Sequence, residues 1–162
     1  SYRVKGMEEF LRVVENCPTE RFALVGRTDL GVNIEKKDNL ELPGYTSGDD
    51  LVRLLNRSKN YLQLSYREGF GIALVEAMAC GCVPIVSDRG ALPEVVGNAG
   101  HVVPDGDSEK VSELVKRPYD PVMGEKARAR AAALDSHARE GSLVRIVNEV
   151  ALIRRIERHG DR

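Results

Sequence analysis

Short apolar runs alternate with amphipathic helix patterns along most of this chain, and the alternation restricts the fold more than any other feature. Apolar runs bounded by Gly, Pro and polar residues are typical of buried strands. Parallel neighbours need a crossover connection, which a helix between two strands supplies. The sequence therefore predicts an α/β fold with an open, doubly wound parallel sheet of the Rossmann-like kind.

The expected elements follow from periodicity and from helix start and stop signals. The predicted strands are Phe22–Val25, Asn39–Leu42, Tyr61–Leu64, Val83–Val86 and Ala99–Val103. The predicted helices cover 6–16, a short stretch after Ser47, 72–80, a turn starting at Pro93, 107–115, 123–134 and 142–156. A length of 162 residues fits one domain. We expect a single domain over 1–162, with an α/β core in 1–118 and C-terminal helices in 119–162.

The charge balance excludes several classes of partner. The chain carries 24 basic and 25 acidic residues, a net charge of −1, so no overall field attracts nucleic acid or anionic lipid. Lys126, Arg128 and Arg130 recur at helical spacing and are interpreted as a solvated helix face. The longest apolar stretch, 72–86, contains Glu76, Gly81 and Pro84 and falls short of the ~20 apolar residues of a membrane span. Membrane association is not indicated.

The cysteines point to a reducing compartment. There are three of them, and Cys80 and Cys82 are separated only by Gly81, a spacing that suits neither a relaxed disulfide nor a zinc site. The sequence starts at Ser1 with a polar helix pattern rather than a secretory signal. We expect a cytoplasmic location.

The loop after the third strand is the strongest candidate for a ligand site. Ligands of open parallel sheets bind at the carboxyl ends of the strands. Ser65–Gly71 lies there, and Gly69 and Gly71 flank Phe70, so that backbone amides can approach a ligand closely. A helix begins directly afterwards. The free amides of Gly71, Ile72 and Ala73, with the positive end of the helix dipole, suit a phosphate or clustered hydroxyls.

Two carboxylates accompany that loop. Glu68 faces the same pocket, and a carboxylate beside a phosphate site fits a sugar, whose hydroxyls donate hydrogen bonds to it. Glu76 lies eight residues later, about two helical turns, and could hold a ribose. In the alternative interpretation the glycines form only a tight turn and Glu76 is a charge at a helix edge. Against this, Glu76 interrupts an otherwise apolar helix, where an unpartnered carboxylate is costly.

Other candidate groups are weaker. The acidic run Asp105-Gly106-Asp107 resembles a metal-binding pattern, but after Pro104 and before a helix it is more simply a turn and a cap, so no metal is assigned. The three histidines have no suitably spaced partner and are interpreted as structural. Lys5, before the first helix, could place an ammonium over a diphosphate, or be an ordinary surface lysine.

At this point the residues resemble a known family. The run 68–81, from Glu68-Gly69-Phe70-Gly71 to Glu76-Ala77-Met78-Ala79-Cys80-Gly81, is similar to the Glu-x7-Glu signature of family-4 retaining glycosyltransferases, which have the two-domain GT-B architecture. Residues 84–88, 92–96 and 100–107 are similar to that family's next strand, its Pro-Glu-Val turn and its following strand and loop. Lys5-Gly6 resembles the Lys-Gly before the first helix of its donor domain. A match this long is more specific than a lone glycine motif.

The resemblance implies the C-terminal, donor-binding domain of such an enzyme and a role for each matching residue. Glu68 would be the catalytic carboxylate near the reacting centre and Glu76 would bind the ribose. Lys5 and the segment Gly69, Phe70, Gly71, Ile72 and Ala73 would hold the diphosphate, and Tyr45 and Thr46 would border the base. The donor would be a UDP-, GDP- or ADP-sugar, with no cofactor and no metal, and the acceptor a glycan, lipid or other molecule.

Two departures from the family pattern limit the expected activity. Only Arg3 precedes Lys5, at the wrong separation for the family's phosphate-binding arginine. The amino-terminal acceptor domain is also absent, so we expect the chain to need it as a partner and not to turn over alone. Two alternatives stay open: a non-catalytic nucleotide-sugar binding or assembly module, and, with least support, a sugar-nucleotide epimerase, which needs placed acid and base groups.

Overall fold

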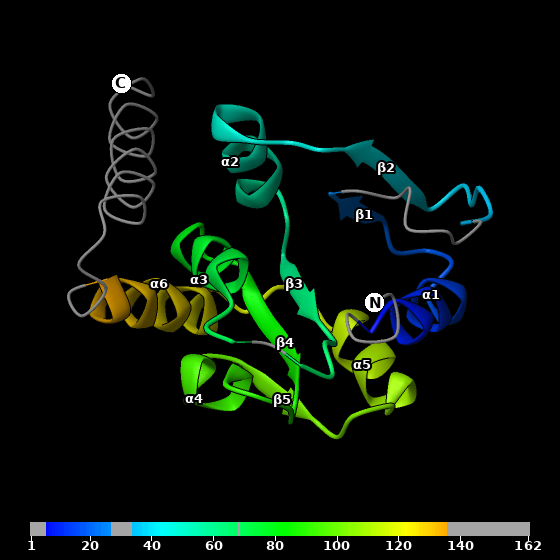
Figure 1. Cartoon of the computed structure of the whole chain (residues 1–162). Coiled ribbons are helices and arrows are strands. Elements are labelled where there is room, and N and C mark those ends of the chain that lie inside the picture. Colours follow the sequence, from blue (N-terminus) through cyan, green and yellow to red (C-terminus); the bar gives the residue numbers. More distant parts are fainter. Residues whose placement is uncertain (1–5, 27–33, 68, 136–162) are drawn as a thin grey trace.

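The structure, a computed structural model, describes residues 6–26, 34–67 and 69–135 (Figure 1). Its elements in chain order are α1 (Met7–Asn16), β1 (Phe22–Val25), β2 (Leu40–Gly44), α2 (Gly48–Asn56), β3 (Asn60–Gln63), α3 (Ile72–Ala79), β4 (Val83–Ser87), α4 (Leu92–Val96), β5 (His101–Val103), α5 (Ser108–Val115) and α6 (Pro121–Asp135). Each predicted strand and helix within these ranges is present, with ends that differ by at most two residues. The predicted helix 142–156 lies outside the described residues.

The described strands pair in parallel, as the alternation predicts, but they form two sheets rather than one. β1 pairs with β2, and β4 lies between β3 and β5, with Leu62 opposite Ile85 and Ile85 opposite His101. Figure 1 shows the small sheet beside α1, apart from the three-stranded sheet. Apolar runs locate strands but do not specify their partners, which is why the sequence does not reveal the division.

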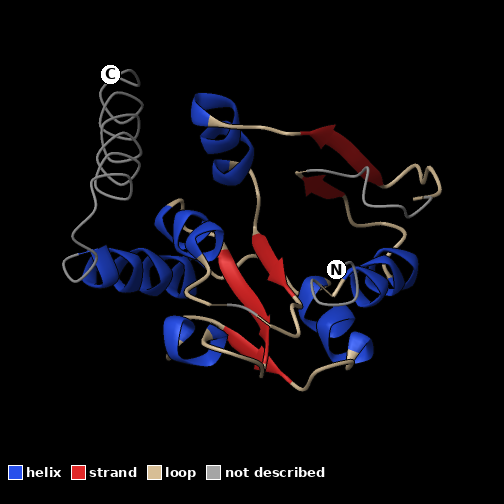
Figure 2. Ribbon diagram, in the orientation of Figure 1, coloured by secondary structure: helices blue, strands red, loops and turns tan. Residues whose placement is uncertain are grey.

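The three-stranded sheet is covered on both faces, which confirms the doubly wound arrangement (Figure 2). Every residue of β4 is buried, and successive side chains point to opposite faces. Ile85 packs in a core cluster with residues of α1 and α5, and Val86 in a cluster with α3, α4 and α6. Phe22 of β1 and Leu40 of β2 join the first cluster, so the small sheet shares that core.

The interpretation of the late basic residues as a solvated face is wrong for two of them. Arg128 donates from Nη1 to the carbonyl oxygen of Cys80 at 3.1 Å, just after α3. Arg130 donates to the carbonyl oxygens of Val95 (3.0 Å) and Glu94 (2.7 Å) in α4. The last carbonyls of a helix have no partner within the helix, so they accept these guanidinium donors. Helical spacing alone does not indicate which neighbouring helix such side chains reach.

Local details also differ from expectation. Ser47 is the N-cap residue of α2 but makes no side-chain capping bond, and Asp50 pairs with Arg53 at 2.7 Å instead. Cys17, Cys80 and Cys82 are buried, and burial raises the pKa of Cys82 to about 12, which disfavours its reactive thiolate form. Among the described helices, none is long and apolar enough to cross a bilayer.

Arg128→Ala tests the contact between α6 and α3. The substitution leaves the Cys80 carbonyl without its donor in a partly buried place, which should lower the free energy of unfolding by about 1–3 kcal/mol. Chemical denaturation measures the change. Lys126→Ala, at an exposed position of the same helix, is the control and should change stability by no more than about 0.5 kcal/mol. Equal effects of the two substitutions would contradict the assignment.

Candidate functional site

The connection from β3 to α3 is anchored at its start and exposed at its middle. Ser65 is buried, and its carbonyl oxygen accepts a hydrogen bond of 2.7 Å from the hydroxyl of Ser87, a buried residue at the end of β4. The two parallel strands are thereby tied together at their carboxyl ends. Tyr66 and Arg67 follow at the surface, with Tyr66 49% exposed. The chain thus leaves the core where an open parallel sheet binds its ligands.

Helix α3 starts with an open amino end. Its N-cap residue, Gly71, has φ 73°, a left-handed conformation that favours glycine, and no side chain caps the helix. The carbonyl of Gly71 accepts from the amides of Leu74 and Val75. Ile72 is 59% exposed and Ala73 is also at the surface. The first-turn amides, which have no partners inside a helix, therefore lie beside solvent. This end can bind an anion.

Glu76 lies in the second turn of the same helix and is half-buried. Burial raises the pKa of its carboxyl above the usual 4.5, and burial is the only cause of that shift. Among the described residues, no hydrogen bond or ion pair satisfies this carboxylate. A partly desolvated carboxylate of this kind gains strongly from hydroxyl groups that donate to it.

A shallow cavity of about 520 Å³ adjoins the loop. It is lined by Tyr66, Arg67, Gly69, Arg89 and Gly90. The guanidinium of Arg89 lies 5.2 Å from the centre of the Tyr66 ring, and its Nε is 3.5 Å from Asp88 and 3.4 Å from Asp105. Arg89 is thus paired with two carboxylates, and the Arg67 guanidinium in the same opening favours an anionic ligand. These arginines could not be singled out from the sequence, because they come from loops after different strands that only the sheet pairing brings together.

The other predicted site residues fall in several places. Glu68 and Lys5 lie outside the described residues. Gly69 and Phe70 are exposed in the loop before α3. Tyr45, 82% exposed, and Thr46 belong to the connection between β2 and α2. Figure 1 shows that connection at the top of the view, above α3. Their role at the base stays a prediction.

The acidic run after β5 has a structural role that the sequence predicts. Asp107 is the N-cap residue of α5, and its carboxylate accepts from the amide of Lys110 at 2.9 Å. His101 lies in β5, and burial lowers the pKa of its imidazole. In the part of the chain that the structure describes, no group of three or more His, Cys, Asp or Glu side chains is arranged to hold a metal ion.

An open parallel sheet with a glycine-rich loop and an exposed helix amino end defines an α/β protein whose loop at the carboxyl ends of the strands is suited to an anionic ligand. The family is shown by comparison with known proteins. This chain belongs to the glycosyl transferases, group 1, whose match covers residues 3–130. The predicted glycosyltransferase family and GT-B fold are therefore confirmed.

Curated relatives share parts of the sequence. The chain is 36% identical over 91 residues to O-antigen chain mannosyltransferase B of Escherichia coli, which covers 56% of this chain and 24% of that protein. It is 40% identical over 88 residues to N-acetyl-alpha-D-glucosaminyl L-malate synthase of Bacillus anthracis, covering 49% of this chain and 23% of that protein. The matches thus span about a quarter of these relatives.

Solved structures share the fold. HepE of Anabaena in complex with UDP-glucose has a TM-score of 0.69 at 19% identity, over 93% of this chain and 45% of that one. Sucrose-phosphate synthase of Thermosynechococcus elongatus has a TM-score of 0.71 at 22% identity, over 98% of this chain and 44% of that one. At these identities the likeness establishes the fold alone.

Glu76→Gln tests the desolvation of the α3 carboxylate. Because the pKa of Glu76 is raised in the folded state, its contribution to stability is present below the ordinary value of 4.5 and is lost as pH rises through the folded pKa. Near neutral pH the charge therefore destabilises the fold, and glutamine should raise the melting temperature there but not in acid. The control is Glu94→Gln on α4, where the side chain is exposed. Destabilisation by Glu76→Gln near neutral pH would contradict this interpretation.

Proposed function

We propose that this chain is the donor-binding half of a retaining glycosyltransferase, which transfers a sugar from a nucleoside diphosphate sugar to a glycan, lipid or other acceptor. The observation that carries the proposal is the open amino end of α3, with Glu76 one turn further along the same helix. An anion-binding helix end beside an unsatisfied carboxylate suits a ligand that carries both phosphate and hydroxyl groups.

The diphosphate is assigned to the loop and the first turn of α3. Gly69 and Gly71 let the backbone approach the phosphates, and the amides of Ile72 and Ala73 donate to them. Arg67 and Arg89 line the cavity next to this loop, and the Arg67 guanidinium extends the positive charge away from the helix end. By its match to the family motif, the Lys5 ammonium would join from the start of α1.

The sugar and the ribose are assigned to the carboxylates. Glu76 would accept hydrogen bonds from the ribose hydroxyls, for which its half-buried carboxylate is suited. Glu68 is assigned to the donor sugar near the reacting centre by its place in the Glu-x7-Glu motif. The base would be bordered by Tyr45 and Thr46, which requires the β2–α2 connection to approach the loop in the complete protein.

The chemistry of transfer follows from this arrangement. As the bond between the anomeric carbon and the diphosphate breaks, negative charge develops on the leaving oxygen. Amides and cations already in place stabilise that charge without rearrangement and lower the barrier. The acceptor hydroxyl oxygen bonds to the anomeric carbon on the face that the diphosphate leaves, and its proton passes to the departing diphosphate oxygen, so the configuration is retained. We assign no metal to this step, and we assign acceptor binding to an amino-terminal domain.

Similar proteins support a nucleotide-sugar donor. One structural neighbour is described in complex with UDP-glucose, and a curated relative is described as a GDP-mannose:cellobiosyl-diphosphopolyprenol alpha-mannosyltransferase. The base and the sugar of this protein's own donor are left open between UDP-, GDP- and ADP-sugars.

Titration with nucleoside diphosphates tests the donor site. UDP, GDP or ADP should shift the backbone resonances of Gly69–Ala73 in ¹H–¹⁵N spectra with saturable dependence on concentration. Glu76→Gln should weaken the binding about tenfold or more, because hydrogen bonds to a charged group are worth about 1.5–3 kcal/mol. Glu94→Gln is again the matched control. Absence of shifts in Gly69–Ala73 with all three nucleotides would reject the proposal.

An activity assay separates the enzyme from a binding or assembly module of the same fold. The protein together with its acceptor domain, given a nucleotide sugar and varied acceptors, should release nucleoside diphosphate and form a glycoside with the anomeric configuration of the donor. Proton NMR of the product reports that configuration. Binding without either transfer or hydrolysis would favour the non-catalytic module.

A further inference from the structure

Arg89 joins the connections that follow three neighbouring strands, β3, β4 and β5. It lies in the connection after β4, and its Nε is 3.5 Å from a carboxylate oxygen of Asp88 and 3.4 Å from one of Asp105, which follows β5. Its guanidinium lies over the ring of Tyr66, which follows β3, at 5.2 Å from the ring centre. We call these four residues, Tyr66, Asp88, Arg89 and Asp105, the Arg89 cluster. It joins distant parts of the sequence at the edge of the sheet where ligands bind.

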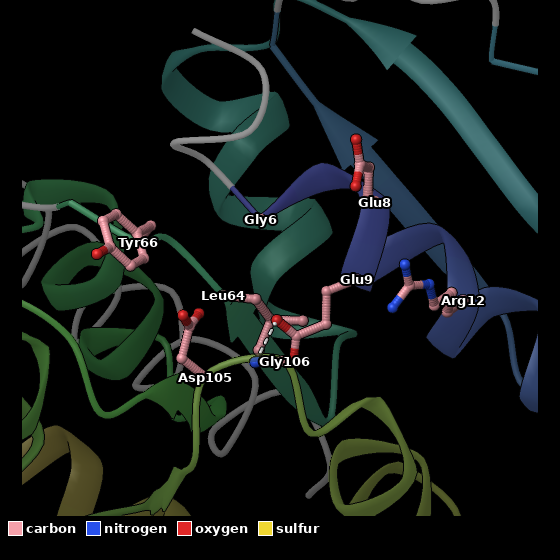
Figure 3. A pocket seen from close by; sticks show the side chains of 8 residues that line it. All are labelled: Gly6, Glu8, Glu9, Arg12, Leu64, Tyr66, Asp105 and Gly106. Carbon is pink, nitrogen blue, oxygen red and sulfur yellow. Dashed lines mark hydrogen bonds between the residues drawn. The ribbon is translucent and has the colours of Figure 1, made fainter.

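The turn that carries Asp105 is held from two sides. Its backbone amide donates to the Asp88 carboxylate at 3.1 Å, and the amide of the next residue, Gly106, donates to the Glu9 carboxylate at 3.3 Å. Glu9 belongs to α1 and is only 7% exposed. Figure 3 shows the Glu9 carboxylate on one side of Gly106 and the Asp105 carboxylate on the other, towards Tyr66. The Asp105 side chain therefore meets Arg89 from a fixed backbone.

The cluster acts near the start of the loop between β3 and α3. Ser65 is fixed by its hydrogen bond to Ser87, and Tyr66 comes next, about half exposed, before Gly69 and Gly71. A guanidinium is attracted to the face of an aromatic ring, and here two carboxylates orient that guanidinium. The ring is thereby held in one place although it lies at the surface. A loop that is ordered in advance loses less conformational entropy when its ligand binds.

The same turn also fixes the start of α1, because Gly106 is bonded to Glu9 in the first turn of that helix. Gly6, the N-cap residue, has φ 69°, and a Cβ at this position would collide with the carbonyl group of Leu64. The start of α1 therefore packs against the residue that follows β3. Lys5, assigned above to the diphosphate, directly precedes Gly6 in the sequence. Both segments that are assigned to the diphosphate thus depend on one turn after β5.

Neither global stability nor direct attraction of a ligand explains the Arg89 cluster. Arg89 and Asp88 are 46% and 49% exposed, and ion pairs at such exposure contribute little to the free energy of unfolding. One guanidinium between two carboxylates leaves a net negative charge, which does not attract a phosphate. The remaining effect of these contacts is to fix the orientation of Tyr66.

We infer that Arg89 and Asp105 are positioning residues for the donor site. Asp105 orients Arg89, and Arg89 holds Tyr66 and with it the loop that contains Gly69 and Gly71, in the conformation that binds the diphosphate. The inference rests on the proposed function, because the ligand of this loop is taken to be a nucleoside diphosphate. Neither positioning residue needs to contact the ligand, since each acts through the order of the loop.

Measurement of ¹⁵N relaxation in the ligand-free chain tests the hold on the loop. Arg89→Ala should lower the heteronuclear NOE of the Tyr66, Gly69 and Gly71 amides, because this quantity reports picosecond-to-nanosecond motion. Tyr66→Leu should do the same, and Tyr66→Phe, which keeps the ring, should restore most of the order. Lys110→Ala removes an ion pair of similar exposure on α5 and is the control, which should leave the loop unchanged. An unchanged loop in Arg89→Ala would overturn the inference.

Nucleotide affinity separates position from charge. The tightest binder among UDP, GDP and ADP should bind Arg89→Ala about two- to fivefold more weakly, the factor that corresponds to one exposed cation–π contact. Asp105→Asn should also weaken binding, although it removes a negative charge near an anionic ligand. The double variant should bind no more weakly than Arg89→Ala, because Asp105 acts through Arg89. The melting temperature should hardly change in these variants. Tighter binding by Asp105→Asn, or additive losses in the double variant, would overturn the inference.

The positioning inference and the proposed function can be told apart. If no nucleoside diphosphate binds the unaltered chain, the proposed function is rejected, and the relaxation data still decide whether the Arg89 cluster orders the loop. If nucleotides shift Gly69–Ala73 but Arg89→Ala changes neither the order of the loop nor the affinity, only the positioning inference is overturned.

Discussion

The whole site depends on the near-complete burial of helix α3. Leu74, Val75, Ala77, Met78 and Ala79 are all buried, so the helix is fixed between the sheet and α6 and has little freedom to move. Such a helix presents to solvent only its first turn and part of the Glu76 side chain. Its carboxyl end is closed, because Arg128 donates to the Cys80 carbonyl. Its amino end is open, and it follows the Ser65–Ser87 hydrogen bond that fixes the start of the loop. Packing of the helix therefore fixes its uncapped first-turn amides in place before a ligand binds. Such preorganised donors are what the stabilisation of a developing negative charge requires.

The carboxylates in this molecule differ in whether the chain itself supplies partners for their charge. Asp107 caps α5 and Asp50 pairs with Arg53, so their charges are satisfied within the chain. Glu76 and Glu9 are different: burial is the first cause of the raised pKa of each, and each retains an oxygen that the described residues do not satisfy. The fold bears this destabilisation at two positions, and at one of them, Glu9, the side chain lines a cavity beside Tyr66. A ligand that donates hydrogen bonds would relieve it at Glu76, which links the stability of the fold to binding.

Much of the fold could be predicted from the sequence because local rules determine it. The apolar runs predicted the strands. Gly71 before the largely apolar segment 72–79 predicted the open start of α3, and Asp107 after Pro104 predicted a helix cap. Contacts between distant segments could not be predicted in this way. The division into two sheets depends on which edges pair, the capping of α3 and α4 depends on how α6 crosses them, and the cavities depend on loops after different strands. Glu9 shows most clearly what the sequence cannot predict. A glutamate in the first turn of an amphipathic helix indicates only a favourable interaction with the helix dipole, and not burial against a distant turn.

A crystal structure of this chain with a bound nucleoside diphosphate would test the central claim most directly. The account predicts phosphate oxygens within hydrogen-bond distance of the Ile72 and Ala73 amides, and ribose hydroxyls against the Glu76 carboxylate. Phosphates bound anywhere other than the amino end of α3, with Glu76 turned away from the nucleotide, would contradict it.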